Sequence, residues 1–250
     1  MPTNRTLAVA ALAATLAGAS AARADLTVVQ STTIKNPQIT AMMQSMSPQQ
    51  RAMMARSGAG AFMGGGPLTS TLYSQGSKTR VDVGPQSTIV DAAAHKLIML
   101  NRATHTYRSS PYSPNAMAGQ MQASVRDTGQ TKTILHHPAR HYVLTMTSAR
   151  MQGARISGDI WSAQDLPQPP AAALAAGGPA AALQGQFRKI KGLPLLVNMT
   201  ISGTPVGDTS IHSVTKSVSR APLSASLFTV PAGYKRAAAR PMPGAMPMGR

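Results

Sequence analysis

The sequence predicts a mostly β protein of the α+β class. Its antiparallel strands are expected to form one curled, half-open sheet or barrel, with short helices covering the concave face. Two observations predict this fold. Short runs of β-branched and alternating residues follow one another at turn-length spacing between residues 68 and 109, and strands joined so closely pair antiparallel. Two segments of helical character interrupt the strands, and a sheet with one apolar face needs such a cover.

The first residues indicate export. Arg5 precedes an apolar stretch from Leu7 to Ala17, and small residues then lead to Ala22-Arg23-Ala24. These are the regions of a secretory signal peptide, and the apolar stretch is shorter than the ~20 residues that a membrane span needs. Residues 1–24 are therefore expected to be a signal peptide that is cleaved near Ala24. The remainder has no cysteine for a lipid anchor and no apolar run long enough to cross a membrane, so we expect a protein of the periplasm or a secreted one.

The strands of the first half follow the chain in order. Residues 26–34 are rich in β-branched side chains, which favour strands. Residues 68–83 contain two alternating strands around a turn at Gln75-Gly76-Ser77. Three further strands with short turns between them are expected at 87–91, 95–101 and 104–109.

The second half combines strands with an Ala-rich region. Strands are expected at 131–136, 141–151 and 154–162. An Ala-rich segment at 171–190 predicts one or two short helices, and closing strands are expected within 193–203, 208–219 and 225–230. Residues 25–236 are thus expected to form a single domain, followed by a disordered Met- and Pro-rich tail at 237–250.

A Met- and Gly-rich helix-loop insertion occupies residues 37–66. Ile39, Met42, Met43 and Met46 recur at helical spacing. Ser47-Pro48-Gln49-Gln50 then has the order of a capping box, with Ser as N-cap, Pro at the first helical position and Gln at the third. The insertion is therefore expected to supply a cover for the sheet.

The composition is strongly basic and excludes several classes of function. The net charge is +17, and all seven acidic residues are Asp. Such a surface attracts anionic partners, among which the envelope surface is expected. Nucleic acid is not expected, because the basic residues are scattered and aromatic residues make up only 4% of the chain, too few for a base-stacking platform. The absence of cysteine excludes disulfides and thiolate metal sites. We also expect the protein to be a monomer.

Catalytic motifs are absent from the sequence. It contains no G-x-S-x-G, no H-E-x-x-H and no Gly-rich phosphate loop. The Asp residues are widely spaced, although a Ser-His-Asp triad can be assembled from distant positions. We therefore expect no catalytic residues, no cofactor and no enzymatic activity.

Methionine and histidine offer an alternative, a copper or other metal site. Thioether sulfur is a soft ligand that suits Cu(I), and the chain has 16 methionines. The tail residues Met242, Met246 and Met248 have no core to pack into, and His136 and His137 lie close together in sequence. These five residues are the metal candidates. For the other methionine groups, packing in a core or an adaptable groove is the competing interpretation.

Several motifs together resemble a family of exported bacterial proteins, domain of unknown function 4412. They are GSKTRVDV, STIVDAAAHKLIMLNRATHTY, GARISGDIWSAQDLP, GLPLLVNM and SLFTVPAGYKR. The last is the most specific, and the match covers most of residues 70–236. The Met-rich insertion and the tail depart from the family pattern. The resemblance implies a fold like that of periplasmic lipoprotein carriers, in which an acyl chain or another hydrophobic ligand lies between a curved sheet and helices. It implies no catalytic residues.

We therefore expect a non-enzymatic carrier or binding protein for a hydrophobic ligand. Flexible Met side chains on a covering helix accommodate ligands of varied shape, and concave apolar sites are the usual binding sites. The ligand cavity is expected to be lined by Ile39, Met42, Met43 and Met46 from the helix and by Ile89, Leu97, Met99 and Trp161 from the sheet. The metal-binding protein is one alternative, and a basic structural protein of the envelope is another.

Overall fold

All strands of the protein belong to one sheet. The computed structural model describes residues 25–50, 66–112, 121–148, 153–168, 189–205 and 207–237. The sheet has 12 strands in the order β12-β6-β5-β4-β3-β2-β1-β11-β10-β9-β8-β7. The strands are β1 (Leu26–Lys35), β2 (Leu68–Gln75), β3 (Lys78–Val83), β4 (Gln86–Asp91), β5 (Lys96–Asn101), β6 (Thr106–Pro111), β7 (Met121–Ile134), β8 (His137–Ser148), β9 (Arg155–Ala163), β10 (Leu193–Ser202), β11 (Thr209–Ser219) and β12 (Lys235–Arg236).

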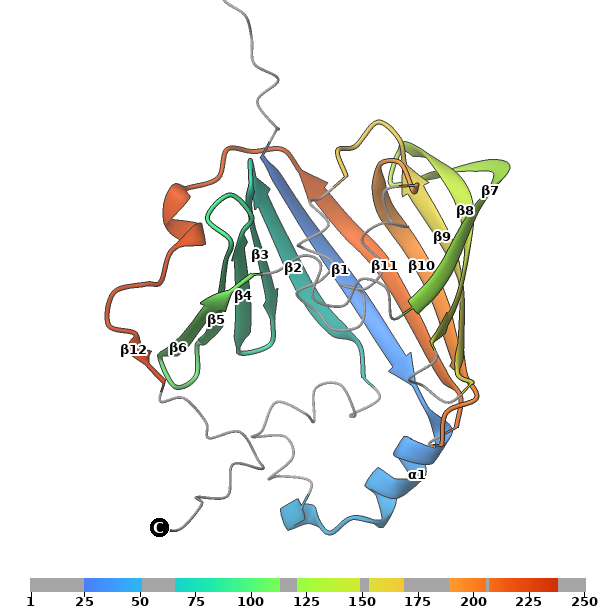
Figure 1. Cartoon of the computed structure of the whole chain (residues 1–250), viewed down its shortest axis with the longest axis horizontal. Coiled ribbons are helices and arrows are strands. Elements are labelled where there is room, and N and C mark those ends of the chain that lie inside the picture. The colour runs from blue at the N-terminus through green and yellow to red at the C-terminus, as the bar shows by residue number, and fades with distance from the viewer. Residues whose placement is uncertain are drawn as a thin grey trace, which may run out of the picture.

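Two antiparallel meanders meet in the middle of this sheet. The first runs from β1 to β6 and the second from β7 to β11, and β1 pairs with β11 from Thr27 opposite Ser219 to Lys35 opposite Ser210. The sheet curls around a concave side, with β6 and β7 on opposite sides of the opening (Figure 1). The expected curled antiparallel sheet with short helices is therefore confirmed. The sheet is open rather than a closed barrel, since the strand order ends at β12 and β7.

Two hairpins of the first meander share one turn design. The Asp91 carboxylate accepts hydrogen bonds from the backbone N–H groups of Ala93 and Ala94. In the same way, the side-chain oxygen of Asn101 accepts hydrogen bonds from those of Ala103 and Thr104. Each turn ends in a histidine with positive φ, 48° at His95 and 49° at His105. Short polar side chains that bind nearby N–H groups favour such turns. β5 and β6 therefore start one and two residues later than the sequence predicts, at Lys96 and Thr106.

The first strand of the second meander is longer than expected. The predicted strand 131–136 is the end of β7, which starts at Met121. Leu135 and His136 both have positive φ, 50° and 64°, and form the two-residue turn to β8. Two such residues in succession match the right-handed twist of the paired strands. The remaining residues of β7 are mostly polar. This strand lies at the edge of the sheet, where a strand need not present one face made entirely of apolar residues.

The C-terminal segment crosses the outer face of the first meander. Ser224 caps a short 3-10 helix, η3 (Ala225–Phe228), by accepting the N–H of Ser226. The expected strand at 225–230 is therefore wrong, because the cap and the burial of Phe228 favour a helical turn over a sheet ladder. Phe228 packs with Ile89, Ile98 and Leu100. β12 then pairs with β6, and this pairing is parallel.

Polar contacts attach this segment to the sheet. The largely buried Arg80 donates to the backbone oxygen of Leu227 at 3.0 Å and pairs with Asp82 at 2.7 Å. The Asp25 carboxylate accepts the N–H of Leu223 at 2.6 Å. These contacts hold the C-terminal segment across β2 to β6, on the outside of the curl (Figure 1).

A short helix follows β1 at one end of the sheet. α1 (Pro37–Ser45) begins at Asn36, whose side chain accepts the N–H of Ile39 at 3.0 Å. None of its residues is buried. The predicted capping box is confirmed, since the Ser47 hydroxyl accepts the N–H of Gln50 and the Gln50 carbonyl accepts that of Ser47. Within the described ranges, no helix is long and apolar enough to span a membrane.

The close approach of Gly192 to β9 makes a test of the fold. Gly192 has φ of +84°, and a Cβ there would lie 1.8 Å from the backbone oxygen of Ala163. We expect Gly192→Ala to lower the free energy of unfolding by at least about 3 kcal/mol, from left-handed backbone and steric displacement together. Gly76→Ala is the control: φ is +58° with nothing within 4 Å, so only the backbone cost of about 1–2 kcal/mol applies. Urea unfolding measures both, and equal losses would contradict the steric account.

Candidate functional site

The second meander presents a continuous apolar surface on the inner face of the sheet. Along β9, Arg155, Ser157 and Asp159 are exposed, while the alternate residues Ile156 and Ile160 are buried. Successive strand side chains point to opposite faces, and the register carries this alternation into the neighbouring strands. The inner face of β7 to β10 is therefore apolar, and the outer face is polar.

This inner surface forms one apolar cluster. Its buried members are Tyr142, Leu144, Met146, Ile156, Ile160 and Ile190, and Ala123, Val125, Val197, Met199 and Ile201 pack around them. Ile190 is fully buried although it precedes β10. The rest of the predicted Ala-rich helical segment, residues 171–188, lies outside the described residues. Each fully buried Leu or Ile contributes about 1.5–3 kcal/mol.

The rim of the cluster is open at the edge strand β7. Ala123 and Val125 are only partly buried there. A cavity of about 280 Å³ lies at the same edge, but four of its lining residues, Gln122, Ser124, Thr145 and Thr147, alternate with Ala123 and Met146 and belong to the polar outer face. The open part of the inner face is therefore the apolar surface itself, from the partly buried Ala123 and Val125 to the buried cluster.

The inner face of the first meander is mixed in character. Leu26, Val28 and Leu72 form a second buried cluster with Leu193 and Leu195 across the β1–β11 junction. The hydroxyl of Thr79 on β3 is buried and has no hydrogen-bond partner among the described residues. Leaving a buried hydroxyl unpaired costs about 1–3 kcal/mol, so Thr79 marks a place where an oxygen acceptor would be stabilised.

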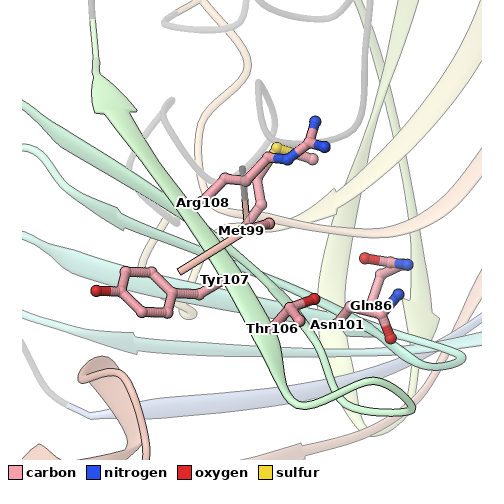
Figure 2. A pocket seen from close by; sticks show the side chains of 7 residues that line it. Gln86, Met99, Asn101, Thr106, Tyr107 and Arg108 are labelled. Atoms are coloured by element: carbon pink, nitrogen blue, oxygen red, sulfur yellow. The ribbon is translucent and has the colours of Figure 1, made fainter. Parts of the chain in front are cut away.

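A second cavity lies toward the other edge, on β4, β5 and β6. It measures about 260 Å³ and is lined by Gln86, Met99, Asn101, Thr106, Tyr107, Arg108 and Ala237. Figure 2 shows Met99 and Arg108 extending together on one face, whereas Tyr107 points to the other. Met99 is 50% exposed. This cavity is polar and basic, unlike the apolar rim of β7.

The structure does not bring the four predicted sheet residues together. Ile89 lies opposite Ile98 and packs under the C-terminal segment with Phe228. Leu97 and Met99 alternate with Ile98 and therefore lie on the inner face. The prediction needed Ile89 to share a face with Leu97 and Met99. The register of β4 and β5 instead pairs Ile89 with Ile98, which places Ile89 on the outer face.

Trp161 lies on the outer face of the second meander. The ring of His141 stacks on Trp161 with centroids 4.6 Å apart, and the Lys132 ammonium lies 4.0 Å from the Trp161 ring centroid. His141 also contacts Asp159, with Nε2 and Oδ1 2.9 Å apart. A tryptophan enclosed by polar neighbours in this way stabilises the outer face of β7 to β9 and is separated by the sheet from the apolar cluster.

The four predicted helix residues lie on and just after α1. Met42 is 45% exposed, and Ile39, Met43 and Met46 are partly buried. None of them belongs to the apolar clusters of the sheet. Their role in covering a ligand stays a prediction.

The predicted metal ligands are not assembled in the described part of the chain. His137 Nδ1 lies 2.6 Å from Asp165 Oδ2, and His136 is exposed in the turn before it. Among the described residues, no group of three or more His, Cys, Asp or Glu side chains could hold a metal ion. Met242, Met246 and Met248 lie outside the described residues, as do the signal peptide and the tail.

Sequence reasoning missed Arg108 and the inner-face residues of β8. The alternation of Tyr142, Leu144 and Met146 in HYVLTMTS was a usable signal for an apolar face. No sequence signal identified Arg108 as a site residue, because its neighbours Gln86 and Asn101 come from other strands of the meander. Only the register reveals that these side chains share a cavity.

Comparisons with known proteins leave the family open. No protein-family model and no curated protein matches the chain, so the resemblance to domain of unknown function 4412 is not confirmed. Among solved structures, a LolA superfamily protein from Nitrosomonas europaea is similar at 9% identity, with a TM-score of 0.32. The alignment covers 83% of this chain and 90% of that one.

The contact between His137 and Asp165 predicts a change in acid titration. The hydrogen bond with His137 lowers the pKa of the Asp165 carboxyl below its ordinary value. A carboxyl with a lowered pKa contributes stability above its unfolded pKa and loses it as the pH falls through the folded pKa. We expect His137→Gln to raise the pKa of Asp165 toward its ordinary value, as measured by carboxyl NMR titration. His136→Gln is the control, and an equal rise there would refute the pairing.

Proposed function

We propose that this protein is a non-enzymatic carrier that binds an acyl chain or another hydrophobic ligand on the inner face of its open sheet. The observation that carries this proposal is the apolar inner surface of β7 to β10, which continues to an open rim at Ala123 and Val125. Curved sheets in soluble proteins bury such a surface against protein or ligand. The partial exposure of the rim gives a ligand a route onto the surface.

The extent of the inner surface supports an extended ligand rather than a compact one. The apolar cluster reaches from Ala123 and Val125 on β7 across β8 and β9 to β10. A chain that lay along it would replace the packing of partly buried residues such as Val197 and Met199. Methionine adapts its shape at little cost, so this exchange tolerates chains of different length.

The buried hydroxyl of Thr79 could bind a polar group of the proposed ligand. It lies on the inner face of β3, two residues from Val81 of the second cluster. An ester or carbonyl oxygen of the ligand could accept its hydrogen bond and relieve the cost of leaving it unpaired. In this proposal the protein acts outside the cytoplasm after cleavage of residues 1–24.

The proposal predicts that a Val→Asn substitution weakens ligand binding when it is made on the inner face of the sheet but not when it is made on the outer face. Val125 on β7 packs with the inner cluster, whereas Val143 on β8 lies opposite Arg126 and Asp159 on the outer face. We expect Val125→Asn to weaken binding of a dansyl-labelled fatty acid about tenfold, because an amide would enter the apolar surface. Val143→Asn should leave binding unchanged. Fluorescence titration gives both affinities, and urea unfolding checks that each variant is folded.

Mass spectrometry of the protein purified under native conditions from the periplasm provides the second measurement. We expect lipid or fatty acid to co-purify with the wild-type chain and to be depleted by Val125→Asn. A ligand-free protein that also fails to bind the dansyl fatty acid would refute the proposal. Equal weakening by both substitutions would place any binding elsewhere.

A further inference from the structure

The cavity on β4 to β6 is built from two rows of side chains on the inner face. Gln86, Asn101 and Thr106 lie opposite one another across the three strands, and Met99 lies opposite Arg108 in the next row. Figure 2 shows Gln86 beside Asn101, and Arg108 beside Met99. The register therefore brings one cation, two amides and a hydroxyl to one cavity.

The pairing of β12 with β6 closes this cavity and adds charge. Lys235 lies opposite Thr106 and Arg236 opposite Tyr107, and the N–H of Ala237 donates to the Tyr107 carbonyl at 2.8 Å. Ala237 lines the cavity, and both basic residues of β12 are exposed. The C-terminal segment thus supplies a wall at Ala237 and one cation, Lys235, on the inner face, whereas Arg236 shares the outer face with Tyr107.

Among the residues that the structure describes, no carboxylate lines the cavity or remains free beside it. Asp82 is held by Arg80 at 2.7 Å and lies 3.9 Å from Arg102, and Asp91 caps its turn and pairs with Lys78 at 3.9 Å. Within the described ranges Arg108 forms no ion pair. A guanidinium stays protonated at all physiological pH values, so its charge is available to a ligand.

Most polar groups of the cavity have a donor to spare. The Thr106 hydroxyl shares a hydrogen bond with that of Thr104 at 2.8 Å, so it donates to a ligand where Thr104 is the donor in that bond. The Asn101 carbonyl already accepts two turn N–H groups, which leaves its NH₂ for a ligand. Arginine presents a planar set of N–H donors that fits the oxygens of phosphate or carboxylate. The volume of about 260 Å³ admits a compact group only.

We propose that this cavity binds a phosphate-type anion, held by Arg108 and by hydrogen bonds from Gln86, Asn101 and Thr106, with Lys235 at its edge. The anion is either free phosphate or the phosphate of a lipid head group. This site goes beyond the carrier function, since the apolar surface of β7 to β10 lies on the other half of the sheet. The two can therefore fail separately.

Two probes distinguish the sources of the anion. Inorganic phosphate is titrated into the full-length mature chain by calorimetry, and vesicles of phosphatidylcholine with or without phosphatidylglycerol are tested by co-sedimentation. We expect Arg108→Gln to weaken binding of at least one probe about tenfold or more, the size of one charge-assisted contact. Arg126→Gln on β7 removes the same charge at an exposed site of the opposite edge strand and should leave binding unchanged.

A neutral substitution separates the cavity from general charge. Gln86→Leu keeps the net charge and removes one donor, and we expect it to weaken the same probe severalfold. If binding of inorganic phosphate depends on Arg108, the cavity is a site for the free anion. If only binding to phosphatidylglycerol vesicles depends on Arg108, the cavity is a site for a lipid head group. Binding of neither probe, or equal weakening by Arg108→Gln and Arg126→Gln, would overturn the proposal. Dansyl fatty acid binding should persist in Arg108→Gln, whatever the phosphate result.

Discussion

The pairing of β1 with β11 is the contact on which the rest of the structure depends. It joins the two meanders through one backbone ladder, and side chains reinforce it, as where Thr32 donates to Ser213 at 2.9 Å. The buried Leu26, Val28 and Leu72 pack across the same junction with Leu193 and Leu195. Because β1 is thereby central, the edges of the sheet are β7 and the β6–β12 pair. The cavity of β4 to β6 and the partly buried end of the apolar surface both lie toward these edges, so the central pairing also determines where ligands can reach the inner face.

Local sequence signals predicted most of the first meander, but not which residues share its faces. Turns rich in Gly, Asp and Asn placed β2 to β5 within one residue at their ends, and the curled antiparallel sheet is confirmed. A shift of one residue in register, however, moves every side chain of a strand to the other face. The register of β4 and β5 pairs Ile89 with Ile98, which places Ile89 under Phe228 on the outer face while Leu97 and Met99 lie on the inner face. The pairing of β1 with β11, some 180 residues apart, and the parallel β12 have no local signal at all.

The two faces of the sheet use their side chains differently. On the outer face, polar neighbours enclose Trp161, and the C-terminal segment covers Ile89, Ile98 and Leu100 with Phe228. Those apolar residues are therefore already committed to internal packing. The inner face of β7 to β10 differs because its cluster ends in partly buried side chains at an edge strand. An apolar surface that reaches an open edge can exchange protein contacts for ligand contacts without breaking the backbone ladder.

The distribution of the few acids explains why the basic charge of the chain remains available. Six of its seven Asp side chains make local contacts: Asp25, Asp82, Asp91, Asp127, Asp159 and Asp165. Asp127 is typical, since the hydrogen bond from Arg140 lowers the pKa of its carboxyl and keeps it ionised in that pair. With 24 Lys and Arg residues against seven acids, internal pairing leaves most cations uncompensated wherever they lie. A cation of this kind on an exposed strand raises the affinity for anions weakly and without specificity. Arg108 differs because its cavity surrounds the charge with further donors, and this arrangement converts a general attraction into a site that can select the shape of an anion.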